Sequence, residues 1–166
     1  MAALQFGEPA PDRRYEDRPA AFGVLAREGK IALVRVTKPN FAPWLDLPGG
    51  ARDPGETDSA AAVREFGEET GLKVSPARLL GRADQFFVNT EDVAYNNRSA
   101  LFEVLFEAES PALKIEADHE LVWLPPLEAI AALRHDSHAW AVCAWIRTVR
   151  DLPKTAPDQS VAPASG

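Results

Sequence analysis

The chain has 166 residues, of which 46% are hydrophobic and 26% are charged, and its net charge is −7. Length and composition predict one globular domain with a single core, and they exclude a disordered or fibrous chain. The negative charge, without a Lys/Arg cluster, argues against a nucleic-acid polymer as partner, because phosphate backbones are bound by clustered cations.

The cysteine content and the distribution of apolar residues bear on the cellular location. Cys143 is the only cysteine, so an intrachain disulfide is ruled out and a reducing compartment is expected. The first residues lack the basic segment and apolar stretch of a signal peptide. No run approaches the roughly 18 apolar residues of a membrane span. We therefore expect a soluble, cytoplasmic protein that binds no membrane.

The composition changes near both ends of the chain. Residues 1–18 are rich in proline and charge and are expected to lead loosely into the fold. Residues 153–166 (PKTAPDQSVAPASG) are small, polar and proline-rich, which predicts a disordered tail. The folded domain is expected over residues 19–152.

The first half of this domain predicts strands followed by a helix. Residues 20–26 and 30–36 are β-rich runs separated by Arg-Glu-Gly, which predicts a hairpin. A proline- and glycine-broken loop follows, ending in LPGG. We predict a helix over residues 59–70, with Asp58 as its N-cap and Gly71 just past its end.

The second half alternates in the same way. Residues 77–89, 99–109 and 120–125 are predicted strands, and the stretch between the first two is expected to be a loop. Helical spacing follows over residues 126–134 and 137–152. The order predicts a mixed α/β domain.

Three glutamates share one face of the predicted helix. Glu65, Glu68 and Glu69 are three and four residues apart, whereas Val63 and Phe66 lie on the opposite side and can pack on a sheet. Exposed like charges at this spacing repel by roughly 0.2–0.5 kcal/mol per pair. A cation should compensate, and Mg²⁺ prefers carboxylate oxygens and is often shared with phosphates. The alternative is an ordinary solvated acidic face.

Residues 50–72, GARDPGETDSAAAVREFGEETGL, resemble the Nudix box, G-x5-E-x7-R-E-U-x-E-E-x-G-U with U a bulky apolar residue, at every specified position. The resemblance implies a Nudix-type α/β/α sandwich with a mixed β-sheet and a loop-helix-loop catalytic motif. It also implies a hydrolase that cleaves a phosphoanhydride bond in a nucleoside diphosphate linked to another group. The implied cofactor is Mg²⁺, with Mn²⁺ as the alternative.

The resemblance also implies residue roles. Glu65, Glu68 and Glu69 would ligate the metal, joined by a backbone carbonyl at Gly49 or Gly50. Arg64 and Glu56 would form a salt bridge that orients these carboxylates.

A base must take the proton from the attacking water. Glu65 or Glu69 could serve, or a glutamate from a later loop, and there the sequence favours Glu120 over Glu116. Other candidates are Glu103 and Glu107, which alternate along a predicted strand. Each later glutamate can equally be a surface carboxylate.

Residues outside the box would choose the substrate. Trp44 and Phe41 precede the LPGG loop and could stack on a base or pack in the core. Arg35 could contact phosphate, as could Lys38 and Arg98. Asn97, with Asn89 and Asn96, could read a base or ribose or could serve turn chemistry.

The substrate class stays open at this point. The ADP-ribose group tends to carry a proline about fifteen residues after the box, and this chain has none there. A nucleoside triphosphate pyrophosphatase is favoured because the chain is compact. Alternatives are ADP-ribose, dinucleoside polyphosphate and nucleotide-sugar hydrolases, and a non-catalytic nucleotide-binding domain. Many relatives dimerise, so a homodimer is a further option.

Overall fold

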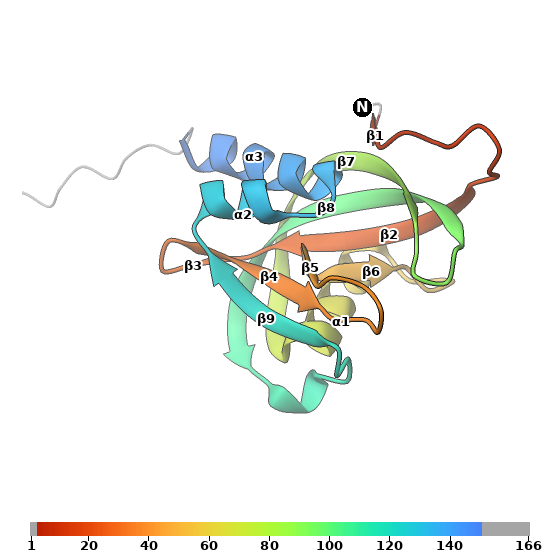
Figure 1. The fold of residues 1–166 in the computed structure, drawn as a ribbon. Coiled ribbons are helices and arrows are strands. Elements are labelled where there is room, and N and C mark those ends of the chain that lie inside the picture. Colours follow the sequence, from red (N-terminus) through yellow and green to blue (C-terminus); the bar gives the residue numbers. More distant parts are fainter. Residues whose placement is uncertain (1–2, 151–166) are drawn as a thin grey trace, which may run out of the picture.

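The computed structural model describes residues 3–150, which form two β-sheets between helices, with α1 on one side and α2 and α3 on the other (Figure 1). The predicted tail, residues 153–166, lies outside the described residues. The strands are β1 (Leu4–Phe6), β2 (Glu16–Val24), β3 (Ala26–Arg27), β4 (Lys30–Val36), β5 (Trp44–Asp46), β6 (Gly49–Ala51), β7 (Leu72–Val88), β8 (Ala94–Glu109) and β9 (His119–Leu124). The helices are α1 (Asp58–Thr70), α2 (Pro126–Ala132), α3 (Asp136–Arg150) and the short 3-10 turn η1 (Pro111–Leu113).

The larger sheet is mixed and has the strand order β1-β7-β8-β2-β6. Strands β7 and β8 form a long antiparallel pair, and β2 runs parallel to β8. Strand β6 pairs antiparallel with β2, with Gly50 opposite Ala21. The glycine loop before α1 is therefore fixed along β2.

The smaller sheet contains β3, β4 and β5, with β9 on the other side of β4. The predicted hairpin is confirmed only next to its turn, where β3 pairs with β4, because residues 20–24 belong to β2 and pair with β8 in the larger sheet. Its turn residues Glu28 and Gly29 have φ of 50° and 76°, the left-handed pair that a two-residue hairpin of this twist requires.

Helix α1 begins and ends close to its predicted limits, but its N-cap differs. Thr57, not Asp58, caps the helix, its hydroxyl accepting from the Ala60 amide at 3.2 Å. Asp58 instead pairs with two arginines from neighbouring segments, Arg52 and Arg82. Gly71 ends the helix at φ 73°, as predicted for a left-handed C-cap.

Apolar packing fixes the helix against the sheets. The Phe66 side chain is fully buried in a cluster with Leu25, Val74 and Val104. Helix α3 packs on the other side against β1, β2 and β7. This arrangement is the α/β/α sandwich that the resemblance implies (Figure 1).

Two segments are more ordered than the sequence predicts. Within residues 1–18, β1 pairs in parallel with β7, and β2 already begins at Glu16. Strand β8 begins at Ala94, so Asn96 and Asn97 lie in the sheet and not in a loop. Asn89 does serve turn chemistry, its side-chain oxygen accepting from the amides of Glu91 and Val93. No helix among residues 3–150 is long and apolar enough to span a membrane.

Candidate active site

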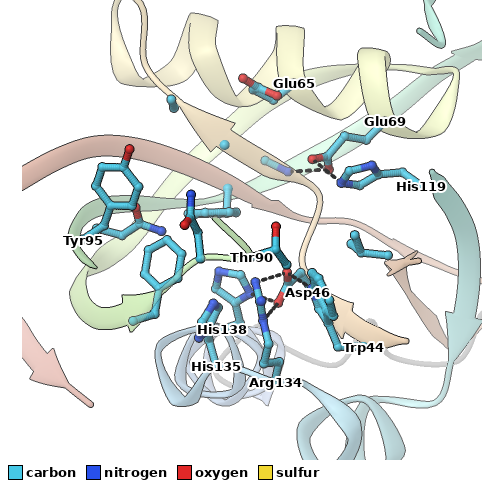
Figure 2. A pocket seen from close by; sticks show the side chains of 18 of the residues that line it. Trp44, Asp46, Glu65, Glu69, Thr90, Tyr95, His119, Arg134, His135 and His138 are labelled. Atoms are coloured by element: carbon cyan, nitrogen blue, oxygen red, sulfur yellow. Dashed lines mark hydrogen bonds and ion pairs between the residues drawn. The ribbon is translucent and has the colours of Figure 1, made fainter. Parts of the chain in front are cut away.

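A pocket of about 440 Å³ lies where α1, the two sheets and the start of α3 meet. Figure 2 shows Glu65 and Glu69 on the side of α1, with Trp44, Arg134 and His138 on the opposite side. The pocket therefore has an anionic side and an aromatic, hydrogen-bonding side.

Glu69 is the most enclosed carboxylate of the anionic side, at 6% exposure. Its Oε2 accepts from the Gly49 amide at 3.0 Å, and its Oε1 lies 3.3 Å from His119 Nε2. Burial raises the pKa of Glu69 well above its usual range, and the nearby charge of Glu65 adds to this. The ionised form of Glu69 is therefore unfavourable in this buried position unless a cation lies nearby.

Glu65 lies against the backbone of the glycine loop. A Cβ placed on Gly50 would be 2.9 Å from the Glu65 carboxyl carbon, so only glycine permits this approach. Burial raises the pKa of Glu65, with Arg64 acting in the opposite direction. The Gly50 backbone and the Glu65 carboxylate therefore meet at the pocket wall.

Arg64 connects the loop to the carboxylates. It donates to Glu56 through Nε and Nη2 at 2.9 and 3.0 Å, to Glu65 at 2.9 Å and to Glu68 at 3.3 Å. It also donates to the Ala51 carbonyl at 3.0 Å. These bonds lower the pKa of Glu56 and raise that of Arg64, the largest cause being the bond between the two. Glu68 contacts Arg64 and does not line the pocket.

We expect Arg64→Lys to lower kcat/KM by about 10- to 100-fold, the usual cost of removing a group that orients ligands. A single ammonium cannot reproduce the planar fork that bonds the loop and two carboxylates at once. Steady-state kinetics would measure the loss. Arg52→Lys, in the same loop but paired with Asp58, is the matched control and should stay near wild type. Equal activity in both variants would contradict the orienting role.

The start of β9 adds a second group of polar residues. His119 Nδ1 lies 2.8 Å from Asp118, whose pKa is lowered to about 2, chiefly by its hydrogen bond from Lys38. Glu116, Asp118 and His119 place potential ligand atoms within 4.8 Å of one another. Glu116 and His119 line the pocket beside Glu69.

The later glutamates favoured by the sequence lie elsewhere. Glu120 lies outside the pocket, its exposed side chain paired with Arg35 at 3.2 Å. Glu103 pairs with Arg78 and accepts from the Trp145 indole, and Glu107 pairs with Lys73. Of the later glutamates named from the sequence, Glu116 lines the pocket, and Glu91, from the turn between β7 and β8, lines it as well.

The opposite side of the pocket is built around Asp46. This buried carboxylate accepts from Arg134 at 2.6 and 3.2 Å and from the Trp44 indole at 2.9 Å. The Arg134 guanidinium also lies 4.4 Å from the centre of the Trp44 ring. The charge of Asp46 is thus neutralised, and the indole is held in one orientation.

Two histidines from the start of α3 complete this side. Burial lowers the pKa of His135 and of His138 to about 3, so both are neutral at physiological pH. His138 Nδ1 accepts from the Leu47 amide at 3.2 Å. Phe87 and Tyr95 lie next to them on paired positions of β7 and β8, with ring centres 5.9 Å apart.

The predicted substrate residues divide between pocket and surface. Trp44 and Asn97 line the pocket. Phe41 is 51% exposed and lies outside it, as does Arg35, which pairs with Glu120 across β4 and β9. Asn97 accepts a hydrogen bond from Arg18 at 3.0 Å, so its amide oxygen is already engaged by the protein.

Several pocket residues carry no strong sequence pattern. Asp46 is a lone acid between Leu45 and Leu47, which hints at a polar contact at the end of a buried strand. Arg18 lies before the apolar part of β2, and at a spacing of four residues it shares one face of the strand with Phe22. Arg134, His135 and His138 look like an ordinary helix start in sequence, and only the fold brings them to the pocket.

Comparison with known proteins agrees with this geometry. An RNA pyrophosphohydrolase of Erythrobacter litoralis is 42% identical over 73 residues, which are 43% of this chain and 43% of that protein. An ADP-ribose pyrophosphatase of Methanocaldococcus jannaschii is 40% identical over 62 residues, 37% of each chain. The chain thus matches less than half the length of these curated relatives.

Solved structures show the same fold. A NUDIX hydrolase from Nitrosomonas europaea superposes with a TM-score of 0.66 at 21% identity, covering 80% of this chain and 90% of that one. A family model described as the NUDIX domain matches residues 17–146, which include the whole box helix and both sides of the pocket. The chain belongs to the NUDIX family.

Proposed function

We propose that this protein is a magnesium-dependent hydrolase that cleaves a phosphoanhydride bond in a nucleoside diphosphate linked to another group. The observation that carries the proposal is a single pocket with Glu65 and Glu69 on one side and Trp44, Phe87 and Tyr95 away from them. Such a pocket can hold phosphates and a base at the same time.

The donor set of the anionic side fits a hard divalent cation. Glu65, Glu69 and the Gly50 backbone offer oxygen ligands at the pocket wall, and burial raises the pKa of both glutamates, which a nearby cation would offset. Glu68 pairs with Arg64 at 3.3 Å and does not line the pocket, so its role as a metal ligand stays a prediction. When bound, Mg²⁺ would neutralise phosphate charge and acidify a water molecule. Mn²⁺ accepts similar ligands.

The chain's own residues fix this arrangement. The Gly49 amide and His119 hold Glu69, and Arg64 ties Glu65 and Glu68 to the loop through Glu56. Among later-loop carboxylates, we assign the role of base to Glu116 in place of Glu120. Its support is position: Glu116 lines the pocket with Glu65 and Glu69, and Glu120 does not.

The aromatic side is suited to a nucleoside. Aromatic faces stack on bases, and neutral imidazoles both donate and accept hydrogen bonds. The pocket has one aromatic side and one anionic side, so it fits a single nucleoside with a phosphate chain better than two nucleosides. We therefore favour a nucleoside triphosphate pyrophosphatase over a dinucleoside polyphosphate hydrolase.

The assay that tests the function is a substrate panel with Mg²⁺ or Mn²⁺, read by product identity. The panel contains nucleoside triphosphates, oxidised triphosphates, ADP-ribose, dinucleoside polyphosphates and nucleotide sugars. Pyrophosphate with a nucleoside monophosphate is the expected product pair, whereas AMP with ribose phosphate would assign ADP-ribose as substrate. Binding of nucleotides without any phosphate-containing product would instead support a non-catalytic domain.

A further inference from the structure

Arg18 lines the pocket from β2, on the strand next to the box helix and glycine loop. Its side chain lies on the same face of β2 as Phe22, because side chains alternate along a strand. Both residues line the pocket. The position therefore belongs to a strand of the larger sheet that pairs with β8, and not to a loop.

Arg18 differs from the other cations of the pocket in having no carboxylate partner. Lys38 pairs with Asp118, and Arg134 pairs with Asp46. Among residues 3–150, no carboxylate lies within 4.0 Å of the Arg18 guanidinium as an ion pair. Burial lowers the pKa of Arg18, and the charges of Glu65 and Glu69 act against this from a distance. An enclosed guanidinium without an anion is costly unless a ligand supplies one.

The guanidinium is held in place by neutral groups. It donates to Asn97 at 3.0 Å, and Asn97 is its register partner on the parallel strand β8. The Tyr95 ring, two residues earlier on the same face of β8, lies 5.7 Å from the guanidinium carbon. Five N–H groups are available on an arginine, and the bond to Asn97 uses only one of them. The other N–H groups of Arg18 are therefore held in a fixed direction, and the charge of the guanidinium is not balanced by a paired carboxylate.

We propose that Arg18 is a phosphate-binding residue, which takes oxygens of a diphosphate lying between α1 and the aromatic side of the pocket. A planar guanidinium matches two phosphate oxygens with a pair of parallel hydrogen bonds. Asn97 then acts through Arg18 as a positioning residue, which replaces the base-reading role that its sequence position suggests. The inference rests on the proposed function only for the identity of the substrate, since the anion site itself requires no hydrolysis.

The test is the affinity of the whole protein for imidodiphosphate, a diphosphate whose bridging nitrogen resists hydrolysis, measured by calorimetry in magnesium. Arg18→Gln should raise its Kd by about 10- to 100-fold, as expected from losing charged hydrogen bonds. Arg18→Lys should fall between, because it keeps the charge and loses the fork. Arg14→Gln removes the same charge at an exposed site outside the pocket and should leave the Kd unchanged.

The outcomes separate this inference from the proposed function. Wild-type affinity in Arg18→Gln, or no binding of imidodiphosphate by the wild type, would overturn the phosphate site even if the substrate panel shows hydrolysis. Arg18-dependent binding without any hydrolysis would overturn the proposed function and leave the phosphate site standing. If Arg18→Gln lacks the wild-type thermal transition, Arg18→Lys decides, and a Kd within twofold of wild type would contradict the proposal.

Discussion

Glu69→Gln is expected to lower kcat by about a thousandfold or more while the protein stays folded. Glutamine has the same shape and can still contact the Gly49 amide and His119, but it cannot supply the anionic oxygen that a metal needs. Charge stabilisation by a bound metal is worth several kcal/mol, and each factor of ten in rate is about 1.4 kcal/mol. Steady-state kinetics with Mg²⁺ and a thermal melt of each variant would measure both effects.

The same substitution has an expected effect on stability that depends on pH. Burial raises the pKa of Glu69 above the ordinary 4.5, so in metal-free buffer the folded protein keeps a proton that the unfolded chain loses. The free energy of unfolding should therefore fall as pH rises from about 4.5 through the raised pKa. Glu69→Gln has no such titrating group, so the stability of the variant relative to wild type should increase over that pH range. If the difference in unfolding free energy between Glu69→Gln and wild type did not change with pH, this would contradict a raised pKa of Glu69.

The second large effect is expected in the packing that positions the box helix. Phe66→Ala should lower the free energy of unfolding by about 3–5 kcal/mol, the usual range for emptying a buried phenylalanine site. The side chain is fully buried where α1 packs on strands of the sheets, and it lies one turn from Glu69. Because domains are stable by only about 5–15 kcal/mol, activity should also fall at temperatures that the wild type tolerates. Urea unfolding gives the loss directly.

Phe41→Ala provides the matched comparison, since Phe41 is 51% exposed and lies outside the pocket. A surface substitution of this kind usually changes stability by less than about 0.5 kcal/mol. Its kcat and KM should also stay near wild type. A loss below about 1 kcal/mol in Phe66→Ala would mean that α1 is not anchored through this ring.

Local rules explain why the box helix was predictable. Apolar and acidic residues recur on opposite faces, Gly71 permits a left-handed end, and the loop glycine allows Glu65 to approach the backbone. The same rules predicted Asp58 as the cap, but Thr57 caps the helix, and Asp58 is engaged by arginines from the loop after β6 and from β7. Local sequence could not show the ion pair with Arg82, because Arg82 is distant along the chain.

The choice between Glu116 and Glu120 shows what the sequence lacks. Neighbouring residues on a strand point to opposite faces, so His119 and Glu120 lie on opposite faces of β9, whereas Glu116 lies in the loop before this strand. Strand β9 begins with His119 toward Glu69, and Glu120 therefore faces Arg35 on the other side of the sheet. Neither residue type nor spacing reveals this register. Trp44 on the aromatic side was a candidate from the sequence, but Tyr95 and His138 were not, because only the fold brings these distant parts of the chain to one pocket.

The most direct measurement for the whole account is a metal titration of hydrolysis, made on wild type and Glu69→Gln with one nucleotide from the panel. Wild type should be inactive in chelator and recover fully with Mg²⁺ or Mn²⁺, and calorimetry should show that Mn²⁺ binding weakens in Glu69→Gln together with the rate. Hydrolysis that persists in chelator, or a Glu69→Gln protein with wild-type metal affinity and rate, would contradict a metal site built on the glutamates of α1.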